Sequence, residues 1–78
     1  MAGHTSESMD KDFLIRLGLR TSEIRKSKNI SQENLAYNND ISLSQIARIE
    51  TGATNPTACT LKVLAEGLGV HIEELFKF

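Results

Sequence analysis

Two short helix-like segments lie close together in the chain, separated only by the polar residues 38–40. Ser31 precedes the first segment and Ser42 the second, and serine is a favoured residue at helix N-caps. Gln45, three residues after Ser42, completes the pattern of a capping box. A connection this short cannot lay two helices side by side unless they cross steeply. The segments therefore predict a helix–turn–helix arrangement.

The rest of the chain continues the helical pattern almost to its end. Apolar residues recur at a spacing typical of helices over residues 11–28, 57–68 and 72–77, and no run predicts a strand. Residues 1–10 lack this periodicity and read as a disordered tail. We expect one compact all-α domain of five short helices over residues 11–78, similar in size to the smallest domains that fold alone. The expected core residues are Phe13, Leu14, Leu17, Thr21, Ile24, Leu35, Ala36, Ile41, Ile46, Ile49, Leu61, Leu64, Ala65, Leu68 and Leu75.

Composition excludes several classes of protein. No apolar run is long enough to span a membrane, and the polar start lacks the apolar middle of a signal peptide. The single cysteine, Cys59, is read as a small buried or half-buried side chain, which fits a reducing, cytoplasmic compartment. There is no paired-carboxylate, metal-spacing or glycine-rich phosphate motif, so we expect no enzyme, no cofactor and no metal. His71 and Glu74 have the spacing of a metal pair, but a plain histidine at a helix start is the favoured interpretation.

Charge is distributed unevenly along the chain. The net charge is −1, which by itself argues against a nucleic-acid partner. The segment 16–28, however, holds five basic residues against one acid, and distribution matters more than the sum. A solvated helix face explains such a segment equally well. The five are Arg16, Arg20, Arg25, Lys26 and Lys28.

The outward face of the second helix in the helix–turn–helix is built from small or hydrogen-bonding side chains. If the apolar residues of this helix face the core, Ser44, Ala47, Arg48 and Thr51 share the opposite face, with Leu43 and Gln45 at its edges. Glutamine and arginine can read base edges, and leucine or alanine can contact a thymine methyl. From spacing alone, a moderately polar solvent-exposed helix fits as well as a DNA-reading one.

Four segments carry a resemblance to a known family. They are IRKSKNISQENLA (24–36), ISLSQIARIETG (41–52), NPTACTLKVLAEGLGV (55–70) and EELF (73–76). In this order and spacing they resemble the Cro/C1-type helix-turn-helix domain, which includes phage repressors, xenobiotic-response-element-type regulators and restriction–modification controller proteins. The resemblance covers roughly residues 13–76, and it implies a lambda-repressor-like fold and a double-stranded DNA partner.

The resemblance also implies roles for individual residues. Gln32 matches a phosphate-contacting glutamine, and Arg25 and Glu50 match a pair that holds the first helix against the third. Base reading is implied for the recognition helix, with Leu43 and Ser44 as its principal readers. The expected base-reading set is Leu43, Ser44, Gln45, Ala47 and Arg48, and the expected phosphate set is Gln32, Arg25, Lys26, Lys28, Thr51 and Thr54, aided by backbone amides near residues 51–54.

Three residues depart from the family pattern. Asn39 stands where an apolar or small residue usually packs under the turn, and Asp40 stands where glycine is usual. Aspartate tolerates the left-handed conformation, so the turn is kept at a cost of about 1 kcal/mol. Leu43 replaces a commoner polar reader, so specificity is expected to depend on neighbouring side chains and on DNA shape.

The sequence thus favours a transcriptional regulator, with repression as the expected action, that binds a palindromic operator as a homodimer. Ile72, Phe76 and Phe78 are the expected dimer surface; alternatively Phe76 packs internally and only Phe78 is free. No small-molecule ligand is expected, so control would come from protein concentration. The rival interpretation is an antitoxin or adaptor module whose main partner is a protein, which the overall acidity favours slightly.

Overall fold

The computed structural model describes residues 6–78, and these form helices joined by short loops. The order is α1 (Ser6–Ser27), α2 (Gln32–Asn39), α3 (Leu43–Glu50), α4 (Ala58–Leu68) and a 3₁₀ helix, η1 (Ile72–Phe76). No strand occurs among these residues. The all-α fold and the helix–turn–helix formed by α2 and α3 agree with the expectation from the sequence.

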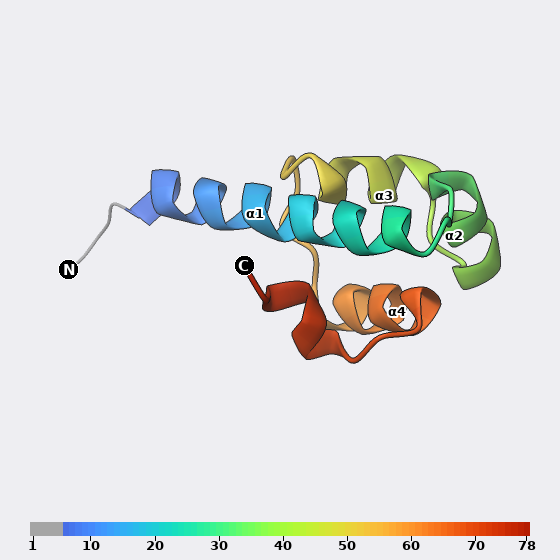
Figure 1. Cartoon of the computed structure of the whole chain (residues 1–78). Coiled ribbons are helices and arrows are strands. Elements are labelled where there is room, and N and C mark those ends of the chain that lie inside the picture. Colours follow the sequence, from blue (N-terminus) through green and yellow to red (C-terminus); the bar gives the residue numbers. More distant parts are fainter. Residues whose placement is uncertain (1–5) are drawn as a thin grey trace.

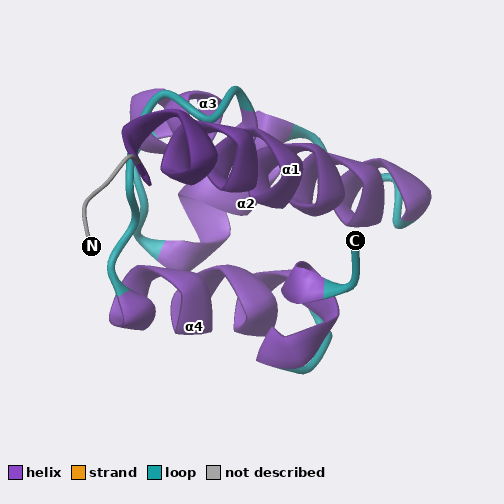
Figure 2. Ribbon diagram, turned by 90° about the vertical axis from the view of Figure 1, so that its left-hand side faces the viewer, coloured by secondary structure: helices purple, strands orange, loops and turns teal. Residues whose placement is uncertain are grey.

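The long helix α1 runs across the molecule, with α3 beside it and α4 in a separate layer (Figures 1 and 2). α1 packs on α3 and on η1, while α2 packs on both α3 and α4. α2 therefore closes one end of the molecule and η1 connects the two layers at the other. This arrangement leaves the outer side of α3 without a covering element in the described part of the chain.

The hydrophobic core lies between these layers and is built from aliphatic side chains, and one threonine is buried among them. Thr21 is fully buried, and its hydroxyl donates to the Leu17 carbonyl at 2.8 Å, so its polar group is satisfied within α1. The buried apolar residues are Leu17, Ile24, Leu35, Ala36, Ile46, Ile49, Leu61, Leu64, Ala65, Leu68 and Leu75, with Leu14, Ile30, Ile41 and Val70 packed partly buried against them.

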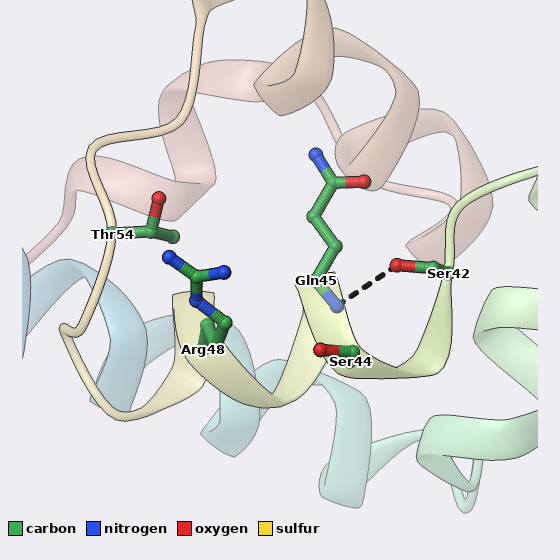
Figure 3. A pocket seen from close by; sticks show the side chains of 5 residues that line it. All are labelled: Ser42, Ser44, Gln45, Arg48 and Thr54. Carbon is green, nitrogen blue, oxygen red and sulfur yellow. Dashed lines mark hydrogen bonds between the residues drawn. The ribbon is translucent and has the colours of Figure 1, made fainter.

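Side-chain caps start the three central helices. The hydroxyl oxygens of Ser31, Ser42 and Thr57 each accept a hydrogen bond from the backbone N–H three residues later. The expected capping box is present only in half, because the Gln45 side chain does not reach back to Ser42. It points away from the cap, toward α4 (Figure 3).

The turn between α2 and α3 uses both unusual residues found in the sequence. Asp40 has a left-handed conformation, with φ of 57°, and its N–H closes the end of α2 on the Ala36 carbonyl. The Asn39 amide donates to the Leu35 carbonyl at 2.8 Å and lies against Gly67 of α4. A Cβ at Gly67 would come within 2.6 Å of that amide nitrogen. The missing side chain of Gly67 thus makes room for the polar side chain under the turn.

Replacing Asp40 with glycine should raise the free energy of unfolding by up to about 1 kcal/mol, because glycine adopts positive φ without steric cost. Asp40→Ala, which keeps the steric cost and loses the polar side chain, serves as the control and should lower it. Urea unfolding followed by circular dichroism measures both. An unfolding free energy that falls in the glycine variant would contradict a strained turn.

Three expectations about the ends of the chain need correction. α1 begins at Ser6, so residues 6–10 are helical instead of belonging to a disordered tail; residues 1–5 lie outside the described residues. The expected fifth helix, 72–77, is the shorter 3₁₀ helix η1. Phe13 was expected on the core stripe of the first helix but is exposed, and among the residues of η1 only Leu75 is buried. No helix in the described region could cross a membrane.

Candidate nucleic-acid interface

The outer face of α3 presents most of the residues expected to read DNA. Leu43, Ser44, Gln45 and Arg48 are exposed, and Ala47 is half-buried. Leu43 is 43% exposed. Ile46, Ile49 and Glu50 fill the opposite face, so the helix is strongly two-sided. α3 is therefore held by its inner face and offers its outer face to a partner.

A groove runs from the outer face of α3 to the start of α4. One part is lined by Ser42, Ser44, Gln45, Arg48 and Thr54, and the adjoining part by Asn39, Asp40, Ile41, Gln45, Cys59, Thr60 and Val63. Gln45 belongs to both parts. In Figure 3 the Arg48 guanidinium extends toward Thr54, while the Gln45 amide extends toward α4. We call this surface the α3–α4 groove.

Arg48 has no acidic partner within ion-pair distance among residues 10–78, whose side chains the structure describes. The three other arginines are all paired: Arg16 with Asp12, Arg20 with Glu23 and Glu74, and Arg25 with Glu50. An exposed, unpaired guanidinium in a groove lined by hydroxyl and amide groups suits a phosphate oxygen or a base edge.

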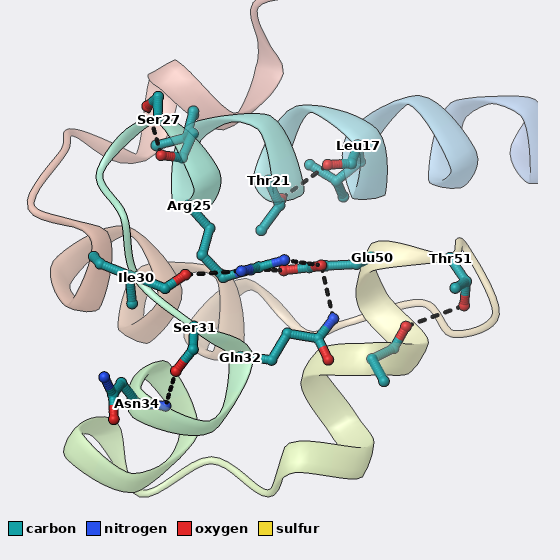
Figure 4. Close-up of polar contacts among 12 residues, drawn as sticks. Leu17, Thr21, Arg25, Ser27, Ile30, Ser31, Gln32, Asn34, Glu50 and Thr51 are labelled. Carbon is teal, nitrogen blue, oxygen red and sulfur yellow. Dashed lines mark hydrogen bonds and ion pairs between the residues drawn. The ribbon is translucent and has the colours of Figure 1, made fainter.

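Behind α3, Arg25 and Glu50 form a buried ion pair at the junction of α1, α2 and α3 (Figure 4). Arg25 Nε and one terminal nitrogen donate to the two carboxylate oxygens at 2.6 and 3.0 Å. The other terminal nitrogen donates to the Ile30 carbonyl at 2.7 Å, just before the cap of α2. Gln32 Nε2 donates to Glu50 Oε1 at 2.8 Å. The pair thus connects all three helices.

Burial alone would raise the pKa of the Glu50 carboxyl, but hydrogen bonds from Arg25 and Gln32 outweigh it and hold the pKa below its ordinary value. The hydrogen bond to Glu50, against a smaller opposing effect of burial, raises the pKa of Arg25. Both groups therefore stay charged at neutral pH.

These shifts predict acid sensitivity. Because the folded-state pKa of Glu50 lies below the unfolded value of about 4.5, its stabilisation is complete above that pH and is lost as pH falls through the folded pKa. The free energy of unfolding should therefore decrease below about pH 4.5. Urea unfolding at a series of pH values tests this. A Glu66→Gln variant, altered at an exposed carboxylate, should keep the same profile, and a wild-type profile flat to pH 3 would contradict the assignment.

Several expected phosphate contacts are differently placed. Arg25 is 7% exposed and its guanidinium donates to Glu50 and Ile30, and its expected phosphate contact stays a prediction. The backbone N–H groups of Thr51, Gly52 and Ala53 donate to carbonyls at the end of α3, which removes three of the amides expected to grip phosphate. The Thr51 hydroxyl also donates to Ala47 and Arg48 carbonyls. Thr54 remains at the groove.

The two lysines at the end of α1 lie outside the α3–α4 groove. Lys26 and Lys28 are both exposed. Lys28 Nζ approaches Gly69, the C-cap of α4, where the negative end of the helix dipole favours a cation. Gly69 lies roughly 15 Å along α4 from Cys59, which lines the groove, because each helical residue adds a rise of 1.5 Å.

The residues on the α4 side of the groove were not predicted from the sequence. Cys59 was expected to be buried or half-buried but is exposed at the start of α4, and Thr60 lies beside it. The only signal was the N-cap at Thr57, since residues of a first helical turn often face solvent. No group of three or more metal-ligating side chains occurs among the residues that the structure describes.

The residues expected at a dimer surface are exposed, and two of them, Phe76 and Phe78, contact Phe13. Phe13 of α1 stacks on Phe76, with ring centroids 6.3 Å apart, and contacts Phe78 at 5.6 Å. All three are 40–49% exposed, and Ile72 is also exposed. We call Phe13, Phe76 and Phe78 the aromatic cluster. Phe13 was not expected in it, because its spacing matches the core stripe of α1.

Comparisons with known proteins agree with this geometry. A helix-turn-helix family profile matches residues 22–75. The control protein C.MunI of a Mycoplasma species is 35% identical over 66 residues, covering 83% of this chain and 89% of that protein. The crystal structure of the restriction-modification controller protein C.AhdI from Aeromonas hydrophila superposes with a TM-score of 0.79 at 33% identity, covering 81% and 96% of the two chains. A tetramer of the controller protein C.Esp1396I, solved with its natural 35 base-pair operator, superposes with a TM-score of 0.72 at 29% identity, covering 83% and 96%.

Proposed function

Because the chain belongs to the Cro/C1-type helix-turn-helix family of regulators, we propose that it is a sequence-specific transcriptional regulator, acting as a repressor through a homodimer on a palindromic operator. The observation that carries this proposal is the outer face of α3, where Arg48 is exposed beside small polar side chains and has no acidic partner among residues 10–78. Its relatives are regulators, so no enzymatic activity is proposed.

In the proposed complex, α3 enters the major groove with its first turn nearest the bases. Leu43 contacts a thymine methyl and Ser44 donates to or accepts from a base edge. The α3–α4 groove then straddles the DNA backbone, so Arg48 and Thr54 contact a phosphate. With few direct donors for bases, the sequence-dependent shape of the DNA contributes part of the specificity.

The homodimer is proposed to form through the aromatic cluster and Ile72. These side chains expose more apolar surface than a monomer of this size needs, and Phe13 and Phe76 are already stacked. A two-fold dimer presents two α3 helices to half-sites about one helical turn apart. Operator binding by the C.Esp1396I tetramer supports an oligomeric DNA complex.

A protein-binding module remains the second candidate, because the net charge is −1 and only a few cations face the groove. An antitoxin or adaptor would use the same exposed face of α3 to hold a protein. The two candidates differ in their response to salt, since DNA binding releases counterions and protein binding depends far less on ionic strength.

Arg48→Ala should weaken DNA binding and reduce the slope of log affinity against log salt concentration by about one. Fluorescence anisotropy with a labelled mixed-sequence duplex at several salt concentrations measures this. Lys62→Ala is the matched control, because Lys62 is exposed, paired with Glu66 and outside the α3–α4 groove. It should leave both affinity and slope almost unchanged.

Two outcomes would count against the proposal. Wild-type binding that is insensitive to salt favours the protein-binding alternative. Equal losses of slope in both variants show a diffuse electrostatic attraction instead of a specific contact at Arg48.

A further inference from the structure

α2 itself carries no lysine or arginine, although the family resemblance assigns its start a phosphate contact. Arg25 is the nearest arginine in the hydrogen-bonded network, and it is buried and engaged with Glu50 and Ile30. Glu33, in the first turn of α2, is acidic and exposed. The donors that α2 itself can offer a phosphate are therefore neutral, and the Gln32 side chain is the one that the network holds in place.

An unrestrained glutamine is a poor phosphate ligand. It samples many rotamers, and restricting them costs conformational entropy. Its amide also presents an oxygen or a nitrogen with nearly equal ease, and the oxygen repels a phosphate.

The hydrogen bond to Glu50 restricts the rotamers of Gln32 and also decides whether its amide presents the oxygen or the nitrogen. A carboxylate only accepts hydrogen bonds, so the Gln32 amide must turn its nitrogen toward Glu50, as the distance of 2.8 Å from Nε2 to Oε1 records. Glu50 is itself fixed by two hydrogen bonds from Arg25. The Nε2 group carries two hydrogens, so one N–H is engaged and the other is left for a further acceptor (Figure 4).

We propose that Glu50 is a positioning residue for DNA binding: its buried carboxylate orients the half-buried Gln32 amide so that the second N–H binds a DNA phosphate at the start of α2. This inference rests on the proposed function. It makes one ion pair serve two tasks, joining α1 to α3 and arranging a neutral phosphate contact on α2.

A double-mutant cycle tests the coupling. Gln32→Met keeps side-chain length and removes the amide, while Glu50→Asp keeps the charge facing Arg25 and draws the carboxylate back by one methylene. Each should weaken binding of a labelled mixed-sequence duplex about tenfold, as expected for a hydrogen bond to a charged group. The double variant should bind no more weakly than either single variant. Losses that multiply would overturn the proposal, because Gln32 and Glu50 would then act independently.

The salt dependence supplies a second readout. Gln32 is neutral, so Gln32→Met should lower affinity by the same factor at every salt concentration and leave the slope unchanged, unlike Arg48→Ala. Asn38→Met, at an exposed position near the other end of α2, is the matched control and should bind like the wild type. A loss of affinity in the control equal to that of Gln32→Met would also overturn the proposal.

A measurement on the wild-type protein covers the case in which Glu50→Asp fails to fold. In ¹H–¹⁵N spectra, the two Gln32 side-chain N–H resonances should be well separated in the free protein, with one engaged by Glu50. Adding the duplex should shift mainly the other. Rapid averaging of the two, or no response to a duplex that binds, would contradict the inference. Failure of the wild type to bind any DNA would instead refute the proposed function.

Discussion

Glu50→Ala should lower the free energy of unfolding by roughly 3–5 kcal/mol, because it leaves the Arg25 guanidinium buried without its counterion. Both side chains are more than nine-tenths buried, with exposed fractions of 7% for Arg25 and 8% for Glu50. The substitution removes the acceptor of two bonds from Arg25 and one from Gln32. For a small domain such a loss is a large part of the total stability. Urea unfolding followed by circular dichroism measures it.

Two controls separate burial from charge. Glu66→Ala breaks an exposed pair with Lys62 and should change stability by less than about 1 kcal/mol. The combined Arg25→Met and Glu50→Leu variant removes both charges and should be markedly more stable than Glu50→Ala alone. If Glu50→Ala is as stable as Glu66→Ala, the buried pair does not hold α1, α2 and α3 together.

Gly18→Ala should destabilise the fold by roughly 2 kcal/mol, although alanine is the better helix former. Gly18 lies on the buried side of α1 where it meets the end of α3. A Cβ there would lie 2.6 Å from the Glu50 carbonyl oxygen and also within contact distance of the Ile49 carbonyl. Both obstacles are backbone atoms, so neither can rotate away and α1 must separate from α3. Thermal and urea unfolding test this directly.

Gly67→Ala is the matched comparison for Gly18→Ala. It is also in a helix interior, but the obstructing atoms belong to the Asn39 side chain, which can turn at the loss of one hydrogen bond. The expected change is from about zero to 1 kcal/mol of destabilisation. Equal effects of the two substitutions would show that the close approach of α1 and α3 is not a special constraint.

Much of the fold follows from local signals in the sequence. Ser31, Ser42 and Thr57 all act as caps, and Asp40 and Gly69 end their helices in the left-handed conformation. Such signals depend on neighbouring residues in the chain, so they can be read without knowing the tertiary structure. The expected crossing of α2 and α3 followed from the shortness of the link at residues 38–40.

The errors arise where tertiary packing decides. The spacing of Phe13 matches the core stripe of α1, yet the side chain lies beyond the edge of the core and stacks on Phe76 instead. The last segment has helical spacing, but it is only five residues long and forms a 3₁₀ helix that buries Leu75 alone. Spacing predicts which face a residue occupies, not how far the neighbouring layer extends.

The candidate interface was predicted in its α3 half and missed in its α4 half. Leu43, Ser44 and Arg48 share one helix, so periodicity alone places them together. Cys59 and Thr60 join them only through the path of the α3–α4 loop, which has no periodic signal. The bond between Gln32 and Glu50 joins residues 18 positions apart, so a single sequence could not reveal it.

The central claim, that the outer face of α3 reads DNA, is tested most directly by selecting bound duplexes from a random-sequence pool and sequencing them, in parallel for the wild type and for a variant combining Ser44→Ala with Arg48→Ala. We expect the wild type to enrich a palindrome with half-sites about one helical turn apart, and the variant to lose that enrichment while remaining folded. If the folded wild type enriches no sequence, or if the variant enriches the same palindrome equally well, the assignment of this face to DNA recognition is wrong.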